Sequence, residues 1–303
     1  MKNTKSTLTA GALVLAALNQ VYGQYAPPPP PAPFPGFINE ALRKDNPYMN
    51  QWDIGGALRM RYEVKENALG LPPANDFRKV TTSTGQNDNS YFSDKVLARI
   101  GYTDKWWSAF IEGRSSSTTG DARSRTGAGT VPGPGAGPES DGVVDLHQAY
   151  FTVGNHKEFP LSLKVGRQEL SYGDERLVGA FAWNNIGRVF DAVKVRAQTP
   201  WFALEAFTSK LVLPDDNNFN MWNDYNLFSG LYLTTKLIPK NTAELYFFSR
   251  NDGIGSATAD SGAVLPFQTA APAARDIYTV GTRFKSNPNE LGNFDYTVEG
   301  AYQ

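Results

Sequence analysis

The sequence predicts an all-β fold, an antiparallel transmembrane β-barrel, and three observations support this prediction. Segments such as WDIGGALRMRYEV (52–64) alternate apolar and polar residues, as strands with one apolar and one polar face do. Long and short connections alternate along the chain, which is typical of outer-membrane barrels. Beyond the N-terminal segment no long apolar run occurs, so any spanning of a membrane must use strands rather than helices.

The first 23 residues have the features of a secretory signal peptide. Lys2 and Lys5 give a positive start, residues 10–18 are apolar, and VYG (21–23) is a small-residue cleavage site. A proline-rich periplasmic segment follows at 24–51, where APPPPPAPFPGF (26–37) reads as a stiff spacer and the remainder as an irregular stretch. The predicted domains are therefore a signal peptide (1–23), this N-terminal segment (24–51) and an outer-membrane barrel domain (52–303).

About eleven strands are predicted from alternation and turn signals. They cover 52–64, 91–103, 107–115, 143–153, 161–168, 189–197, 201–209, 227–238, 242–250, 276–285 and 294–303. Bacterial barrels of this class have an even number of strands and both chain ends on the periplasmic side. The prediction is therefore a barrel that is incomplete at its C-terminus, or a count that misses one strand.

Four tryptophans lie where predicted strands begin beside short connections, namely Trp52, Trp106, Trp107 and Trp201. Aromatic side chains gather at the membrane–water interface of barrels. The sequence therefore predicts an aromatic girdle at the periplasmic end, with Trp183 and Trp222 in long loops.

Composition excludes several classes of site. The chain has no cysteine, and without Lys2 and Lys5 it carries 27 basic and 30 acidic residues, a net charge of about −3. This balance argues against a general nucleic-acid binder. His147 and His156 lie on different predicted elements and make a poor metal-ligand set, so we expect a polar lumen residue and a turn residue. For Asp215 and Asp216 a solvated loop tip is favoured over a calcium site. No metal or cofactor is expected.

Basic residues recur on the predicted inner faces of successive strands. The predicted pore-lining residues are Arg59, Arg61, Lys95, Arg99, Arg114, Arg167, Lys194 and Arg196. Rings of arginine and lysine favour the passage of anions. A generic polar lumen without anion preference is the alternative.

The stretch GRQELSYGDERLVGAFAWNNIGRVFDAVKV (166–195) reads as a rising strand, a long loop and a returning strand. Its dense opposite charges predict a loop that folds back on the barrel mouth and is held by ion pairs. The predicted loop-anchoring residues are Glu169, Asp174, Arg176, Arg188 and Asp191. Adjacent carboxylates such as those of Asp174 and Glu175 rarely reach the ~5–9.5 Å opposed geometry of glycoside hydrolysis, so no catalytic residue is expected.

The same stretch resembles the hallmark segment of the alginate export family, and DLHQAYFTV (145–153) and LRMRYE (58–63) fit that family's pattern. The resemblance extends from Trp52 to the end of the chain. It implies an outer-membrane barrel of roughly eighteen strands, which needs a longer chain, and an arginine-rich lumen through which a polyuronate passes. The motif positions that it carries over are Arg167, Asp174, Arg176, Arg188 and Asp191.

The leading hypothesis is an outer-membrane channel, without catalysis, for export or diffusion of anionic solutes such as the acidic polysaccharide alginate. Its expected partners are outer-membrane lipid, an anionic polysaccharide or small anionic solutes, and periplasmic export machinery, with no nucleic acid. The alternatives are a secreted all-β carbohydrate-binding or hydrolytic protein, a general porin, and a structural barrel with a plugged lumen.

Overall fold

The computed structural model describes residues 36–65, 89–121, 141–213, 219–222, 226–253, 275–292 and 294–303. The predicted signal peptide, the polyproline run up to residue 35 and the Asp215–Asp216 pair lie outside the described residues.

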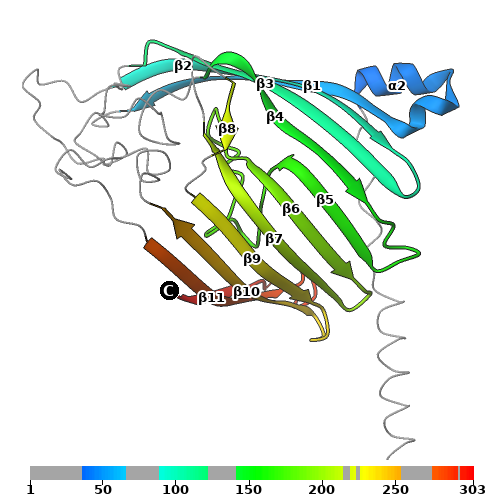
Figure 1. Ribbon diagram of the computed structural model, residues 1–303, viewed down its shortest axis with the longest axis vertical. Helices are drawn as coiled ribbons and strands as arrows, with labels where there is room; N and C mark the ends of the chain where they lie inside the picture. The colour runs from blue at the N-terminus through cyan, green and yellow to red at the C-terminus, as the bar shows by residue number, and fades with distance from the viewer. Residues whose placement is uncertain are drawn as a thin grey trace, which may run out of the picture.

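One antiparallel sheet holds the strands in chain order and curves into a barrel-like wall (Figure 1). Its strands are β1 (Trp52–Lys65), β2 (Asn89–Thr103), β3 (Trp107–Thr119), β4 (Asp141–Val153), β5 (Leu161–Gln168), β6 (Phe190–Gln198), β7 (Phe202–Leu213), β9 (Asn226–Thr235), β10 (Asn241–Asp252), β11 (Arg275–Ser286) and β12 (Thr297–Tyr302). A two-residue strand, β8 (Met221–Trp222), lies off this path and pairs with β7. The predicted all-β antiparallel fold is confirmed.

Each strand on the main path corresponds to one of the predicted strands, with ends that differ by at most four residues. β7 runs to Leu213, four residues beyond its predicted end at 209, and β8 lies inside the connection that was predicted as a plain loop. The last strand begins at Thr297 rather than at residue 294. Before it, Ser286 and Tyr296 are tied by hydrogen bonds that belong to a turn, including one from the Tyr296 amide to Ser286 Oγ at 2.9 Å.

The two faces of the wall differ as the alternation predicts. On β1, the exposed fractions of Leu58, Met60 and Tyr62 are 66%, 60% and 68%. Arg59 and Arg61 alternate with them and point to the opposite face, where they contact other parts of the chain. We call the charged side the inner face and the exposed apolar side the outer face, by analogy with the polar interior of barrels.

β4 alternates poorly in the sequence because it carries an irregularity. The register of β3 against β4 shifts between Glu112 and Gly113, where Glu112 pairs with Gln148 but Gly113 pairs with Leu146. His147 is therefore an extra residue, as in a β-bulge, and a bulge re-aims a side chain at this point. The side chain of His147 is 4% exposed and contacts inner-face groups.

A row of aromatic rings lies at strand ends that carry short connections, and it includes Trp52 and Trp107 of the predicted girdle. Trp52, Tyr102, Trp107 and Phe151 form a chain of ring contacts with successive centroid distances of 5.0, 5.0 and 5.6 Å. These residues belong to four neighbouring strands, so the girdle follows the sheet. Such a row is suited to a membrane interface, where amphipathic rings settle.

Residues before β1 are ordered into two short helices, which corrects the expectation of an irregular stretch. Helix α2 (Phe37–Lys44) is followed by the 3-10 helix η1 (Pro47–Gln51). Asn39 in α2 donates from Nδ2 to Asp53 at 2.7 Å and accepts from the Ile54 amide at 2.8 Å. Arg43, one turn later on the same side of the helix, donates to the Trp52 carbonyl. Together they fasten the helix to the start of β1.

An aromatic layer covers part of the inner face over β7, β9 and β10. Tyr232 and Tyr246 stack with centroids 5.7 Å apart, and Phe207 and Phe248 adjoin them. Two glycines make room for these rings: a Cβ on Gly281 would lie 2.4 Å from the Tyr246 ring, and one on Gly230 would lie 2.6 Å from Phe248. The glycines therefore let large rings lie flat on neighbouring strands.

Within the described residues, no helix combines the length and apolar character needed to cross a membrane.

Candidate functional site

The connection between β5 and β6, residues 169–189, crosses the inner face, and we call it the crossing loop. One end of it reaches the strands β1 to β3, and the other end reaches β9 to β12. Strand pairing cannot hold a segment that runs across a sheet, so its position depends on side chains from the wall. Those side chains are the first part of the candidate site.

Arginines on β1 hold the far part of the crossing loop through its backbone. Arg59 donates to the carbonyl oxygens of Ala182 (2.9 Å) and Asn184 (3.1 Å). Arg61 donates to the Trp183 carbonyl at 2.6 Å and lies 4.7 Å from the centre of the Trp183 ring. Charge-assisted hydrogen bonds of this kind are stronger than neutral ones. Two predicted pore-lining arginines thus act as anchors of the loop.

β3 continues this attachment. Arg114, 3% exposed, donates to the Ile186 carbonyl at 2.5 Å, and Ser116 donates to the Asn185 carbonyl at 2.7 Å. The Asn185 side chain is fully buried and donates in turn to the Asp94 carbonyl of β2 at 2.7 Å. The WNNIG part of the loop is therefore fixed to three adjacent strands by buried polar contacts.

At the other end, Asp174 accepts a hydrogen bond from Arg283 of β11 at 2.5 Å. Arg283 also donates twice to the Glu244 carboxylate, at 2.5 and 2.9 Å, and is 7% exposed. The hydrogen bond from Arg283 lowers the pKa of the Asp174 carboxyl below its usual value. Arg176 lies 3.9 Å from Glu299 of β12 and is largely exposed, so this pair contributes little.

The part of the crossing loop before Asp174 rests on the aromatic layer. Tyr172 stacks on Tyr232 with centroids 4.6 Å apart and on Phe207 at 5.5 Å. Leu170, 1% exposed, belongs to the same buried cluster. Burial of such rings stabilises the loop more than its exposed ion pairs do.

Glu169 reaches back to β4 at the start of the crossing loop. Its carboxylate lies 3.1 Å from His147 Nε2, and the other ring nitrogen of His147 lies 3.3 Å from Arg114. The inner-face position predicted for His147 is confirmed, and His156 lies in the turn between β4 and β5, as predicted. Among the described residues no group of histidine and acidic side chains could hold a metal ion.

Arg167 differs in placement from the other predicted pore-lining residues. It has the parity of Leu163 and Val165, on the outer face, and pairs in register with Asp191. Its guanidinium is bidentate with Asp191, at 2.9 and 3.0 Å, and also donates to the carbonyl of Asn220 at 3.0 Å. The placement of Arg167 on the inner face is therefore corrected: it is 6% exposed within the wall, where β5 ends and the segment before β8 begins.

The second part of the candidate site is a basic patch on β5, β6 and β7, formed by Lys164, Lys194, Arg196 and Glu205. Lys164 and Lys194 pair in register on the inner face, and Lys164 Nζ lies 3.5 Å from the centre of the Tyr150 ring. Glu205 of β7 lies 3.2 Å from Lys194 Nζ and accepts a hydrogen bond from Arg196. Two of the three cations contact the one carboxylate, and the patch has a net positive charge.

The remaining predicted pore-lining residues also have inner-face parity. Arg99 of β2 donates to Asp53 at 3.1 Å, close to the girdle. Lys95 stands opposite Arg59 in register and is 8% exposed, so it lies beneath the attached part of the crossing loop. The inner face thus carries both signs of charge, and the basic patch is one place where positive charge is in excess.

The five predicted loop-anchoring residues divide into three groups. Asp174, Arg176 and Glu169 contact strands on the inner face, while Asp191 is bound within the wall. Arg188 is held through its backbone amide, which donates to the Ala180 carbonyl at 2.8 Å. Sequence reasoning missed Lys164 as a patch residue and Arg283 as an anchor. Alternation of Lys164 with Leu163 and Val165 was a usable signal for the first.

The chain also has a family assignment. The family model described as alginate export matches residues 50–303, which covers the whole sheet and the crossing loop. A search of curated proteins found no match.

Proposed function

Because the chain belongs to the alginate export family, which is a family of outer-membrane channels, we propose that it provides an anion-selective path for an acidic polysaccharide. Alginate is the cargo that the family's name indicates. The observation that carries the proposal is the basic patch, in which Lys194 and Arg196 contact the carboxylate of Glu205 and Lys164 stands opposite Lys194. Passage needs no catalysis and is driven by a gradient or by periplasmic export machinery.

The patch is suited to weak, repeated contact with carboxylates. Lys164 and Lys194 are partly exposed, so their ammonium groups can meet a solute without complete loss of hydration. A channel site must attract the ion enough for entry but hold it weakly enough for release. Flexible lysine side chains meet this requirement better than the rigid, buried Arg283–Glu244 pair.

Planar bilayers that contain the full chain test the proposal. Under a salt gradient, the reversal potential should show preference for the anion, and added alginate oligomers should reduce the current. A reversal potential that shows no anion preference would favour a general porin and overturn the proposal. Detergent-independent solubility of the exported chain would favour the secreted alternative.

A barrel with a plugged lumen is a second candidate, because the crossing loop is attached at both of its ends by buried polar contacts. That arrangement predicts no conductance in the wild type. Conductance that appears after the loop is detached would assign the loop a closing role.

A further inference from the structure

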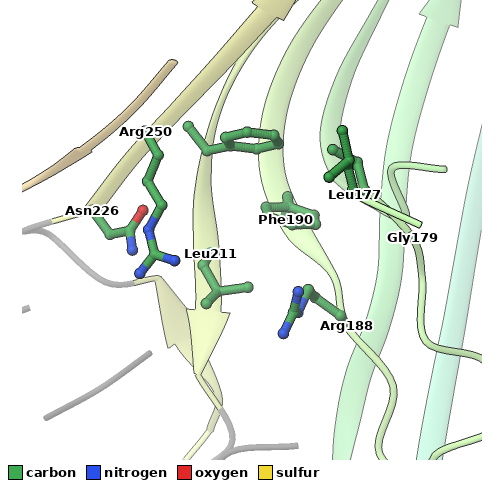
Figure 2. A pocket seen from close by; sticks show the side chains of 9 residues that line it. Leu177, Gly179, Arg188, Phe190, Leu211, Asn226 and Arg250 are labelled. Atoms are coloured by element: carbon green, nitrogen blue, oxygen red, sulfur yellow. The ribbon is translucent and has the colours of Figure 1, made fainter. Parts of the chain in front are cut away.

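A cavity of about 170 Å³ lies on the inner face at the strand ends that carry the long connections. Its apolar walls are Val178, Phe190, Leu211 and Phe228, and Arg188 and Arg250 enter it from opposite sides (Figure 2). Pockets that hold whole small molecules measure about 300 Å³ or more, so this one accommodates part of a larger ligand.

Arg188 is available to a ligand in this cavity. Its backbone amide donates to the Ala180 carbonyl at 2.8 Å, and this hydrogen bond fixes the backbone position from which the side chain extends. Its Nε is buried and has no hydrogen-bond partner among the described residues. A buried guanidinium nitrogen without a partner is unfavourable, and an incoming carboxylate would remove this cost.

Arg250 gives the cavity a second positive group that is partly neutralised. Its Nε donates to Asp252 at 3.0 Å, and its side chain extends toward the Arg188 side of the cavity (Figure 2). Glu175 lies at the rim, since a Cβ on Gly179 would be 2.8 Å from its Oε2. Arg188 is therefore the main anion-binding group, and Glu175 would repel a second carboxylate.

The walls determine what accompanies the carboxylate. Phe190 and Phe228 have ring centroids 5.9 Å apart, and Leu211 lies between the two arginines (Figure 2). An inorganic anion gains nothing from these apolar surfaces, whereas the C–H face of a sugar ring packs against them. The cavity is thus suited to a ligand that carries one anionic group next to an apolar face.

We propose that this cavity binds one uronate unit of a passing acidic polysaccharide, with the carboxylate on Arg188 and the ring against Phe190 and Phe228. The inference rests on the proposed function, since it names a binding step for the same cargo. It is distinct from the basic patch, which lies farther along β6 and β7 from the strand ends that carry the long connections. The cavity would hold a chain segment after it has passed the patch.

Binding of a uronate trisaccharide to the detergent-solubilised full chain tests this inference. Arg188→Gln should weaken binding about tenfold, as expected for loss of one charge-assisted hydrogen bond. Arg176→Gln is the matched control, because Arg176 is on the same loop but is largely exposed, pairs with Glu299 and does not line the cavity. Leu177→Trp, which fills the cavity from its half-exposed edge and keeps both arginines, should weaken binding similarly.

The outcomes separate this inference from the proposed function. Unchanged trisaccharide binding in both Arg188→Gln and Leu177→Trp would overturn the inference, and so would equal binding of a neutral trisaccharide. Competition by inorganic phosphate at the same concentration as the trisaccharide would also overturn it, since the walls would then play no part. If these results occur while the wild-type channel still prefers anions in bilayers, the inference fails and the proposed function stands. Loss of anion preference in the wild type would reject the proposed function itself.

Discussion

Lys164 on β5 and Lys194 on β6 stand opposite each other in register on the inner face of the sheet. Like charges directly opposed across two strands destabilise a sheet. One carboxylate, that of Glu205, offsets them by its contact of 3.2 Å with Lys194 and its hydrogen bond from Arg196. A patch that keeps an uncompensated positive charge at a cost in stability is expected to serve the passage of anions.

Glu205→Gln should raise the preference for anions. It removes the one negative charge of the basic patch, and a unit charge is worth about 1 kcal/mol at 4 Å in water, so the permeability ratio should rise roughly twofold to fivefold. The measurement is the reversal potential under a salt gradient. Glu158→Gln, which breaks an exposed pair with Lys105 in a short turn, is the control and should change nothing.

The double change Arg59→Ala and Arg61→Ala should release the far part of the crossing loop. It removes charge-assisted hydrogen bonds to the carbonyls of Ala182, Trp183 and Asn184, which weakens the attachment by roughly 2–4 kcal/mol. We expect larger single-channel conductance and faster tryptic cleavage within the loop.

Arg99→Ala is the control for loop release, since Arg99 pairs with Asp53 and does not contact the crossing loop. If the double variant and this control give the same conductance and the same cleavage rate, the anchoring role of the β1 arginines is wrong.

The attachment at Asp174 should be sensitive to acid. The pKa of Asp174 is lowered in the folded protein by its hydrogen bond from Arg283. The contribution is therefore complete above the usual aspartate pKa of about 3.9 and is lost as the pH falls through the lowered value. Conductance recorded from pH 7 down to pH 3 should be constant to about pH 4 and then rise.

Asp174→Asn provides the comparison for this acid response. The variant should show higher conductance already at pH 7 and a smaller rise below pH 4. An identical profile in the wild type and the variant would show that another acidic group controls the loop.

Arg167→Gln should reduce stability without changing ion selectivity. The bidentate pair with Asp191 is buried in the wall, and breaking a buried pair by removing one partner costs about 3–5 kcal/mol. The temperature at which the heat-modifiable gel mobility changes should fall, whereas the reversal potential should stay at its wild-type value. A shift of the reversal potential toward cations would contradict this placement and show that Arg167 lines the lumen.

The sheet could be predicted from the sequence because each strand has one face in an apolar and one in a polar setting. Alternation therefore located β1 and β2 closely. Alternation is less regular at β4, where the extra residue His147 interrupts the period of two, but the predicted strand 143–153 matches β4 to within two residues. Arg167 was predicted on the inner face although alternation gives it outer-face parity, and it is buried where β5 ends and Asp191 supplies a partner.

The candidate site was harder to predict because it depends on contacts between distant segments. The charges of the loop indicated that it folds inward, but nothing local showed that Arg59 and Arg61 bind its carbonyls from more than a hundred residues away. Helix α2 was missed, although Glu40 in its first turn and Arg43 and Lys44 in its last turn were usable signals.

The most direct test of the account is the ion selectivity of the double variant Lys164→Gln and Lys194→Gln in planar bilayers. The account predicts that the wild type prefers anions and that this preference falls sharply in the double variant. Lys157→Gln, a change at an exposed position in the turn before β5, is the control and should keep the wild-type reversal potential. An anion preference that is unchanged in the double variant would contradict the role of the basic patch.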